Sequence, residues 1–163
     1  ALIALWVGLG SRGPILFSQP RFGYRGEKFT IWKFRSMDGQ ADPDLQAVPG
    51  DARVLHPWLR RSHLDELPQL WNVLRGDMSL VGPRPHMASD TQRYADAVRG
   101  YGIRHWVRPG ITGLAQARGL HGFADQEAMT ERVKADVYYV EHWSVALDLK
   151  IMLATLLRAR GWV

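Results

Sequence analysis

The sequence predicts a helix-rich α+β fold in a single domain, and three observations support this class. The chain has 163 residues, which suits one domain and leaves little room for a second independent core. Its 46% apolar and 23% charged residues exclude disordered, collagen-like and coiled-coil proteins. One early stretch is rich in β-branched and aromatic residues, as strands are, whereas later apolar residues recur at helical spacing.

The first predicted elements are an apolar start and a small β-hairpin. Residues 1–9 are wholly apolar, but about 20 such residues are needed to span a bilayer. They are either the end of a truncated hydrophobic element or a short core helix. Residues 15–18 and 28–34 flank a turn-rich stretch, which indicates the hairpin. Residues 36–51 are rich in Asp, Gly, Pro and small polar types, and they predict a surface loop.

A helix is predicted after this loop. Leu64, Leu67, Trp71 and Leu74 are spaced so that they lie on one side of a helix, and Gly76 is expected to end it. Asp65 and Glu66 would then lie at the start of this helix, because Pro68 follows them and proline is tolerated only in the first turn of a helix.

Two proline-containing segments separate the later helices. Residues 82–85 and 108–113 predict stiff, non-helical connections, because proline fixes its own φ and disfavours helix at the residue before it. Further helices are predicted at 88–98, 126–141 and 144–160. The last of these is basic and amphipathic, so it lies either on a membrane surface or against the domain core.

The charge and the residue types narrow the function classes. Lys and Arg number 21 against 16 Asp and Glu, so the net charge of +5 predicts an anionic partner. Phosphorylated small molecules, nucleic acid and acidic lipid all remain open, and seven Trp residues weakly favour a membrane interface. The absence of cysteine excludes thiol catalysis and disulfide scaffolds. No two of the six histidines have the helical spacing of a zinc site.

The strongest chemical feature is the pair Asp65 and Glu66. The positive end of the predicted helix should favour the ionised form of Asp65 and would also accept a phosphate. An ionised carboxylate beside a phosphate site is a candidate nucleophile. Adjacent helical residues point about 100° apart, so one carboxylate can attack while the other holds a metal. The alternative is that Asp65 is an ordinary N-cap and Glu66 a first-turn partner of the helix dipole.

Several cations could form an anion site with this pair. Arg84 lies between two prolines, and Arg108 precedes a Pro-Gly turn. Lys33 and Arg35 add positive charge at the end of the predicted strand. Arginine suits bidentate phosphate contact, although any one of these cations is more often a solvated surface residue. Carboxylates with phosphates suit Mg²⁺, which prefers hard oxygen ligands.

Residues 65–85, DELPQLWNVLRGDMSLVGPRP, resemble the signature of bacterial sugar transferases, the monotopic phosphoglycosyl transferases that start polysaccharide and glycoconjugate assembly. The resemblance continues through residues 33–37, 107–116, 138–141 and 147–150, and it covers nearly the whole chain. It implies transfer of a sugar 1-phosphate from a UDP-sugar to polyprenyl (undecaprenyl) phosphate. This is the first membrane step of exopolysaccharide, capsule or O-antigen synthesis.

The resemblance also implies roles for individual residues. Asp65 would be the nucleophile that forms a covalent phosphosugar intermediate, and Glu66 would hold Mg²⁺. The remaining residues expected to bind substrate are Lys33, Arg35, Arg84, Arg108, Thr112 and Gln116. One departure is Ser62-His63, where a Thr-Ser pair is usual in the family, and the role of His63 is unexplained.

The family's architecture implies a membrane-associated catalytic domain with amphipathic interfacial helices. Residues 1–12 would be the end of a truncated N-terminal re-entrant membrane helix, and residues 13–163 the catalytic domain. The expected location is the cytoplasmic face of the bacterial inner (plasma) membrane. The expected partners are a UDP-sugar, polyprenyl phosphate and the membrane surface, and nucleic acid is not an expected partner. A second copy of the chain, forming a homodimer, is a further candidate partner.

Two alternatives belong to other functional classes. A basic, tryptophan-rich nucleic-acid-binding module would interleave aromatic and cationic residues on one surface. Trp71 and Trp143 instead fall among apolar residues. An inactive family member that serves as an assembly partner is the second alternative, and retention of Asp65, Glu66 and Arg84 argues against it.

Overall fold

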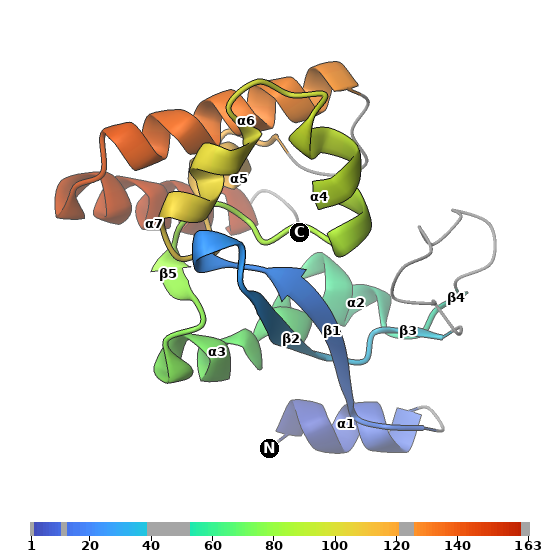
Figure 1. Cartoon of the computed structure of the whole chain (residues 1–163). Coiled ribbons are helices and arrows are strands. Elements are labelled where there is room, and N and C mark those ends of the chain that lie inside the picture. Colours follow the sequence, from blue (N-terminus) through green and yellow to red (C-terminus); the bar gives the residue numbers. More distant parts are fainter. Residues whose placement is uncertain (1, 11–12, 39–52, 121–125, 161–163) are drawn as a thin grey trace.

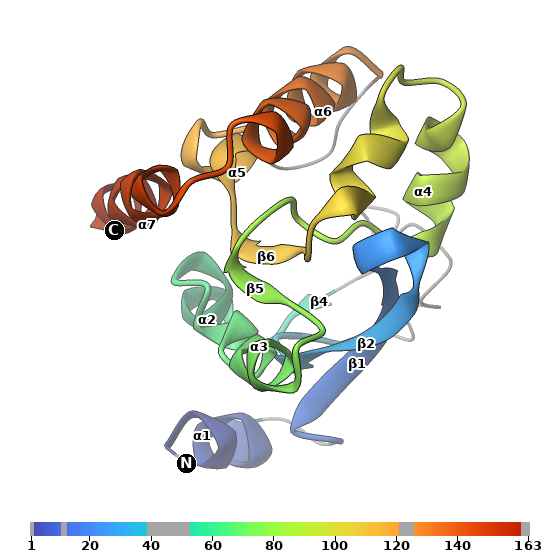
Figure 2. The same cartoon turned by 60° about the vertical axis from the view of Figure 1, so that its left-hand side comes forward.

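The structure is a computed structural model, and it describes residues 2–10, 13–38, 53–120 and 126–160. It is helix-rich with small sheets, as the sequence predicts. The α-helices are α1 (Leu2–Gly10), α2 (Pro57–Arg61), α3 (Gln69–Arg75), α4 (Ala88–Ala95), α5 (Leu114–Ala117), α6 (Gln126–Glu141) and α7 (Val145–Arg160). In Figures 1 and 2, α4, α5 and α6 lie at one end of the molecule and α1 at the other.

The described strands form three two-stranded sheets. Strands β1 (Leu16–Phe22) and β2 (Lys28–Phe34) are the predicted hairpin, paired antiparallel from Leu16↔Phe34 to Phe22↔Lys28. Strands β3 (Met37–Asp38) and β4 (Arg53–Val54) are also antiparallel. Strands β5 (Ser79–Val81) and β6 (Gly110–Thr112) are parallel. Three 3₁₀ helices complete the described elements, namely η1 (Tyr24–Gly26), η2 (Leu64–Glu66) and η3 (Tyr101–Trp106).

The parallel pair β5–β6 joins the two proline-containing segments. Gly82 N donates to Thr112 O at 2.9 Å, and Gly110 N donates to Pro83 O at 3.0 Å. A Cβ atom at Gly110 would collide with the backbone of Gly82, so the close approach needs glycine at this position. The sequence predicts both segments as stiff connections, but it does not predict that they pair with each other.

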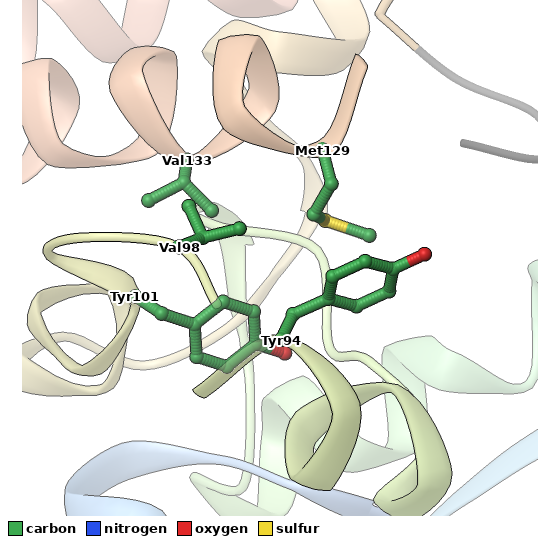
Figure 3. Close-up of a cluster of buried hydrophobic side chains, with 5 residues drawn as sticks. All are labelled: Tyr94, Val98, Tyr101, Met129 and Val133. Atoms are coloured by element: carbon green, nitrogen blue, oxygen red, sulfur yellow. The ribbon is translucent and has the colours of Figure 1, made fainter. Parts of the chain in front are cut away.

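Two clusters of buried apolar side chains form the described core. Figure 3 shows the first, in which Met129 and Val133 of α6 pack on residues of α4, η3 and the segment between them. Its members are Tyr94, Val98, Tyr101, Met129 and Val133. The second cluster joins Val81 of β5 to Tyr139 and Ile151. These clusters fix η3 and α6 relative to the strand that leads into residues 82–85.

The helical expectation around residue 65 is partly wrong. The segment divides into η2 and α3, and α3 begins at Gln69 with Pro68 as its N-cap. Pro68 has no N–H to donate, and the turns on either side of it use hydrogen bonds between residues three apart, such as Leu70 N to Leu67 O at 3.0 Å. Gly76, with φ of 83°, ends α3 as predicted.

Other boundaries differ less. The helix predicted at 88–98 ends at Ala95, whereas those predicted at 126–141 and 144–160 are confirmed as α6 and α7. Most of the loop predicted at 36–51 lies outside the described residues. Ser36, at its start, is buried rather than on the surface. The helix η3 and the pairing of β5 with β6 are not predicted.

The apolar start of the chain is a helix in its described part. Val7 of α1 is buried, and the Trp6 ring packs on His56 with ring centroids 4.5 Å apart. Leu2 and Leu9 are strongly exposed. Within residues 2–10, 13–38, 53–120 and 126–160, no helix has the length and apolar character needed to cross a membrane.

Candidate active site

Asp65 and Glu66 are buried side by side in η2, with 7% and 8% of their surfaces exposed. The 3₁₀ turn begins after His63, whose φ of 54° is in the left-handed region. Helix η2 packs on β2, which brings the two carboxylates to the end of that strand. Because the two residues are adjacent in a tight turn, their side chains contact different partners.

Glu66 is held by two cations. Lys33 Nζ of β2 lies 2.8 Å from Glu66 Oε1. Arg84 makes a bidentate contact, with Nη2 to Oε1 at 2.6 Å and Nη1 to Oε2 at 3.2 Å. Burial alone would raise the pKa of Glu66, but the charges of Arg84 and Lys33 outweigh it and hold the pKa well below its ordinary value. Glu66 is therefore ionised at neutral pH.

Asp65 has a different environment. Ser36 Oγ donates a hydrogen bond to Asp65 Oδ2 at 3.0 Å. Burial and the neighbouring Glu66 charge raise the pKa of Asp65, and the Ser36 hydrogen bond and the Lys33 charge offset this only in part. The expectation that a helix end favours the ionised form of Asp65 is therefore wrong in direction. Helix η2 has only three residues, so its dipole is too small to dominate.

The position of Arg84 is fixed from behind by a buried ion pair. Arg104 Nη2 of η3 donates to the main-chain oxygen of Arg84 at 2.8 Å. The same nitrogen lies 2.8 Å from Asp136 Oδ2 of α6, and both side chains of this pair are almost fully buried. Sequence reasoning missed Arg104 and Asp136. The available signal was helical spacing, since Asp136 continues the buried side of α6 that Met129 and Val133 define.

A cavity of about 160 Å³ lies beside the Glu66 ion pairs. Lys33 and Arg84 form part of its wall, and Gln116 of α5 also lines it. Arg21 of β1 and Arg132 of α6, which sequence reasoning missed, line it as well. Its remaining lining residues are Ile31, Pro85, His86, Asp90, Arg104, Ala115, Leu120 and Asp136.

The structure brings together only some of the predicted substrate-binding residues. Lys33, Arg84 and Gln116 share the cavity, whereas Arg35, Arg108 and Thr112 are not among the residues that line it. Thr112 Oγ1 lies 2.7 Å from Thr155 Oγ1, a contact that joins β6 to α7. Arg108 is exposed, and the Arg35 guanidinium lies against Gly13.

The acidic pair limits how a Mg²⁺ ion could bind. The described ranges contain no group of three or more His, Asp or Glu side chains close enough to hold a metal by themselves. Mg²⁺ in proteins commonly uses one or two carboxylates and takes its other ligands from water and substrate phosphates. Glu66 Oε1 already accepts from both Lys33 and Arg84, so a Mg²⁺ ion would bind Glu66 through Oε2, whose described contact is Arg84 Nη1.

Comparison with known proteins shows the family to which the chain belongs. Residues 1–160 match the sequence model of the family described as bacterial sugar transferase. The chain belongs to the bacterial sugar transferase family.

Three relatives show the range of this family. The UDP-glucose:undecaprenyl-phosphate glucose-1-phosphate transferase of Klebsiella pneumoniae is 46% identical over 162 residues, which cover 96% of this chain and 35% of the relative. The Caulobacter vibrioides protein of the same name is 50% identical over 159 residues, 94% of this chain and 60% of the relative. The Rhizobium leguminosarum exopolysaccharide production protein PSS is 42% identical over 173 residues, 98% of this chain and 86% of the relative. The chain thus spans less than two thirds of the first two relatives.

Proposed function

We propose that this chain transfers a sugar 1-phosphate from a UDP-sugar to undecaprenyl phosphate, with Asp65 as the nucleophile. The names of the Klebsiella and Caulobacter relatives support the substrate classes and the group transferred. The observation that carries the assignment of Asp65 is the contrast within the acidic pair. Both oxygens of Glu66 are held by Arg84, whereas the described contact of Asp65 is one hydroxyl donor.

The proposed reaction has two displacements. An Asp65 carboxylate oxygen attacks the phosphorus that bears the sugar, the bond from that phosphorus to the bridging oxygen breaks, and UMP leaves. An oxygen of undecaprenyl phosphate then attacks the same phosphorus, and the bond to Asp65 breaks. Lys33 and Arg84 stabilise charge on the transferred group, because phosphoryl transfer depends mainly on positioning and electrostatics. A Mg²⁺ ion held by Glu66 would neutralise charge on the diphosphate.

We also propose that the chain works at a membrane surface, namely the cytoplasmic face of the bacterial plasma membrane. Helices α1, α2 and α7 lie along the left-hand edge of the molecule in Figure 2. Each carries large apolar side chains that are exposed. They include Leu2, Leu5 and Leu9 of α1, Trp58 of α2, and Leu149, Leu153, Leu156 and Leu157 of α7. Exposed apolar surface of this extent favours a membrane or protein interface.

The proposed reaction is tested by a covalent intermediate. Incubation with a panel of UDP-sugars, without lipid, should add one phosphosugar mass to the chain for the correct sugar and release UMP. Intact-mass spectrometry measures the addition, and peptide mapping locates it. Asp65→Asn should show no addition, because an amide is a poor nucleophile. An adduct on another residue, or normal turnover by Asp65→Asn, would exclude the proposed mechanism.

A further inference from the structure

The cavity beside Glu66 carries more positive charge than its own carboxylates neutralise. Five cationic side chains line it, namely Arg21, Lys33, Arg84, Arg104 and Arg132. Its lining includes two carboxylates, Asp90 and Asp136. Glu66, just outside the lining, pairs with Lys33 and Arg84. The remaining excess of positive charge favours an anionic group inside the cavity.

Arg21 is a cavity cation with an unsatisfied buried donor. Its guanidinium donates to Gln19 Oε1 through Nη2, but its buried Nε has no hydrogen-bond partner within the described residues. Burial and, next, the charge of Arg84 lower the pKa of Arg21 to about 10. A buried guanidinium beside a second one costs free energy unless an anion lies between them. A phosphate oxygen would supply that anion and accept the Nε–H hydrogen bond.

Gln116 also lines this cavity, and its side chain carries an unpaired acceptor. Its Nε2 donates to the main-chain oxygen of Ile111 at 3.1 Å, which orients the amide. Its Oε1 is buried and has no partner within the described residues. A phosphate group at neutral pH offers acceptors only, so it cannot satisfy Gln116 Oε1. A hydroxyl or an N–H on the ligand can donate to that oxygen.

The unpaired Arg21 donor and Gln116 acceptor together select one substrate class. A nucleotide sugar carries a diphosphate next to hydroxyl groups, whereas polyprenyl phosphate has a phosphate on a hydrocarbon chain. The cavity, at about 160 Å³, also holds more than the ~10–15 Å³ that a single water needs. We propose that this cavity binds the diphosphate of the nucleotide sugar through Arg21 and a neighbouring donor group of the same substrate through Gln116. The inference rests on the proposed function for the identity of that substrate.

Equilibrium binding tests this proposal without turnover. Calorimetric titration of the 163-residue chain in Mg²⁺ buffer would use UDP-glucose, inorganic pyrophosphate and farnesyl phosphate as probes. Arg21→Gln should weaken the binding of both UDP-glucose and pyrophosphate by about tenfold or more, since a hydrogen bond to a charged group is lost. Gln116→Leu should weaken the binding of UDP-glucose but leave the affinity for pyrophosphate within about twofold of that of the unchanged chain. Farnesyl phosphate should be unaffected by either change.

The controls separate binding from folding. Arg93→Gln removes an exposed arginine of α4 outside the cavity and should leave all three affinities unchanged. If Arg21→Gln does not fold by thermal unfolding, Arg21→Lys retains the charge without the guanidinium Nε and should still weaken pyrophosphate. Unchanged UDP-glucose affinity in the folded Arg21 variant would overturn the proposal. A selective loss of farnesyl phosphate binding in that variant would also overturn it, because this result would place the lipid phosphate in the cavity.

The outcome is distinguishable from failure of the proposed reaction. If UDP-glucose binds through Arg21 but no UDP-sugar yields UMP, the cavity assignment stands and the transferase proposal fails. If UMP is released while Arg21→Gln leaves the KM for the UDP-sugar unchanged, the transferase proposal stands and the cavity assignment fails.

Discussion

Asp65 and Glu66 are neighbours in sequence, yet the fold shifts their pKa values in opposite directions. The cations Arg84 and Lys33 keep Glu66 charged, whereas burial and the Glu66 charge raise the pKa of Asp65. Environments that separate two carboxylates in this way commonly assign them different chemical tasks. The ionised form of Asp65 therefore costs stability in the folded state, which is expected of a nucleophile and not of a structural cap.

This cost predicts that Asp65→Asn makes the protein more stable while abolishing turnover. A raised pKa means that ionised Asp65 destabilises the fold; this cost is absent well below the ordinary value of 3.8, grows as pH rises from there to the raised pKa, and is constant above it. The stability gain of the variant should therefore be larger at pH 7.5 than at a pH near the ordinary value of 3.8. Urea unfolding at both pH values measures it, and each 1 kcal/mol would raise the Tm by about 2–4 °C. A less stable Asp65→Asn variant would contradict the prediction.

Glu66→Gln is the matched comparison and should act in the opposite sense. The lowered pKa of Glu66 means that its charge contributes stability above its ordinary value of 4.5, and that this contribution is lost as pH falls toward the lowered pKa. Removing the charge leaves Lys33 and Arg84 without their carboxylate. We expect a loss of about 2 kcal/mol at pH 7.5, moderated because Arg84 is partly exposed to solvent. Urea unfolding under the same conditions as for Asp65→Asn checks the sign.

At the scale of elements, η3 and α6 act on the site through the Arg104–Asp136 pair. Burial raises the pKa of Asp136 as it does that of Asp65, but Asp136 is paired with the almost fully buried Arg104, so Asp136→Asn leaves that charge without its carboxylate and should cost about 3–5 kcal/mol. It should also lower kcat, since Arg104 then holds the main chain of Arg84 less firmly. The double variant Arg104→Met with Asp136→Leu should recover most of the stability but not kcat. Recovery of both would show that the pair has only a structural role.

The elements that sequence predicts well are those whose pattern is local. The hairpin β1–β2 and helices α6 and α7 follow from residue type and periodicity within each segment. The parallel pairing of β5 with β6 joins segments about thirty residues apart, and no local pattern specifies such a partner.

The site shows the same division between local and long-range information. Glu66 and Arg84 come from one continuous motif, so sequence reasoning placed both of them in the site. Arg21 lies on the hairpin and Arg132 on α6, and only the fold brings these two arginines to one cavity. The position of Asp65 at a predicted helix start makes it a candidate site residue from sequence alone. The direction of its pKa shift depends on burial, which cannot be predicted from the motif.

At the scale of the whole molecule, the exposed apolar side chains on α1, α2 and α7 predict binding to lipid. Trp58 belongs to α2 and is 61% exposed, whereas Trp106 belongs to η3, which is not one of these three helices, and is 69% exposed. Trp58→Glu should reduce partitioning onto anionic phospholipid vesicles by about tenfold, because a large apolar side chain no longer enters the interface. Trp106→Glu should have little effect and provides a control for the added charge.

Vesicle flotation measures this partitioning, and Leu153→Glu on α7 extends the test to a second helix of the same edge. Because Trp58 and Leu153 are both exposed, neither substitution removes a buried contact of the core. Thermal unfolding should show little change for Leu153→Glu. Equal losses for Trp58→Glu and Trp106→Glu would mean that added negative charge alone weakens binding to an anionic surface. In that case the edge formed by α1, α2 and α7 would not be the membrane-facing side, and its exposed leucines would require a protein partner instead.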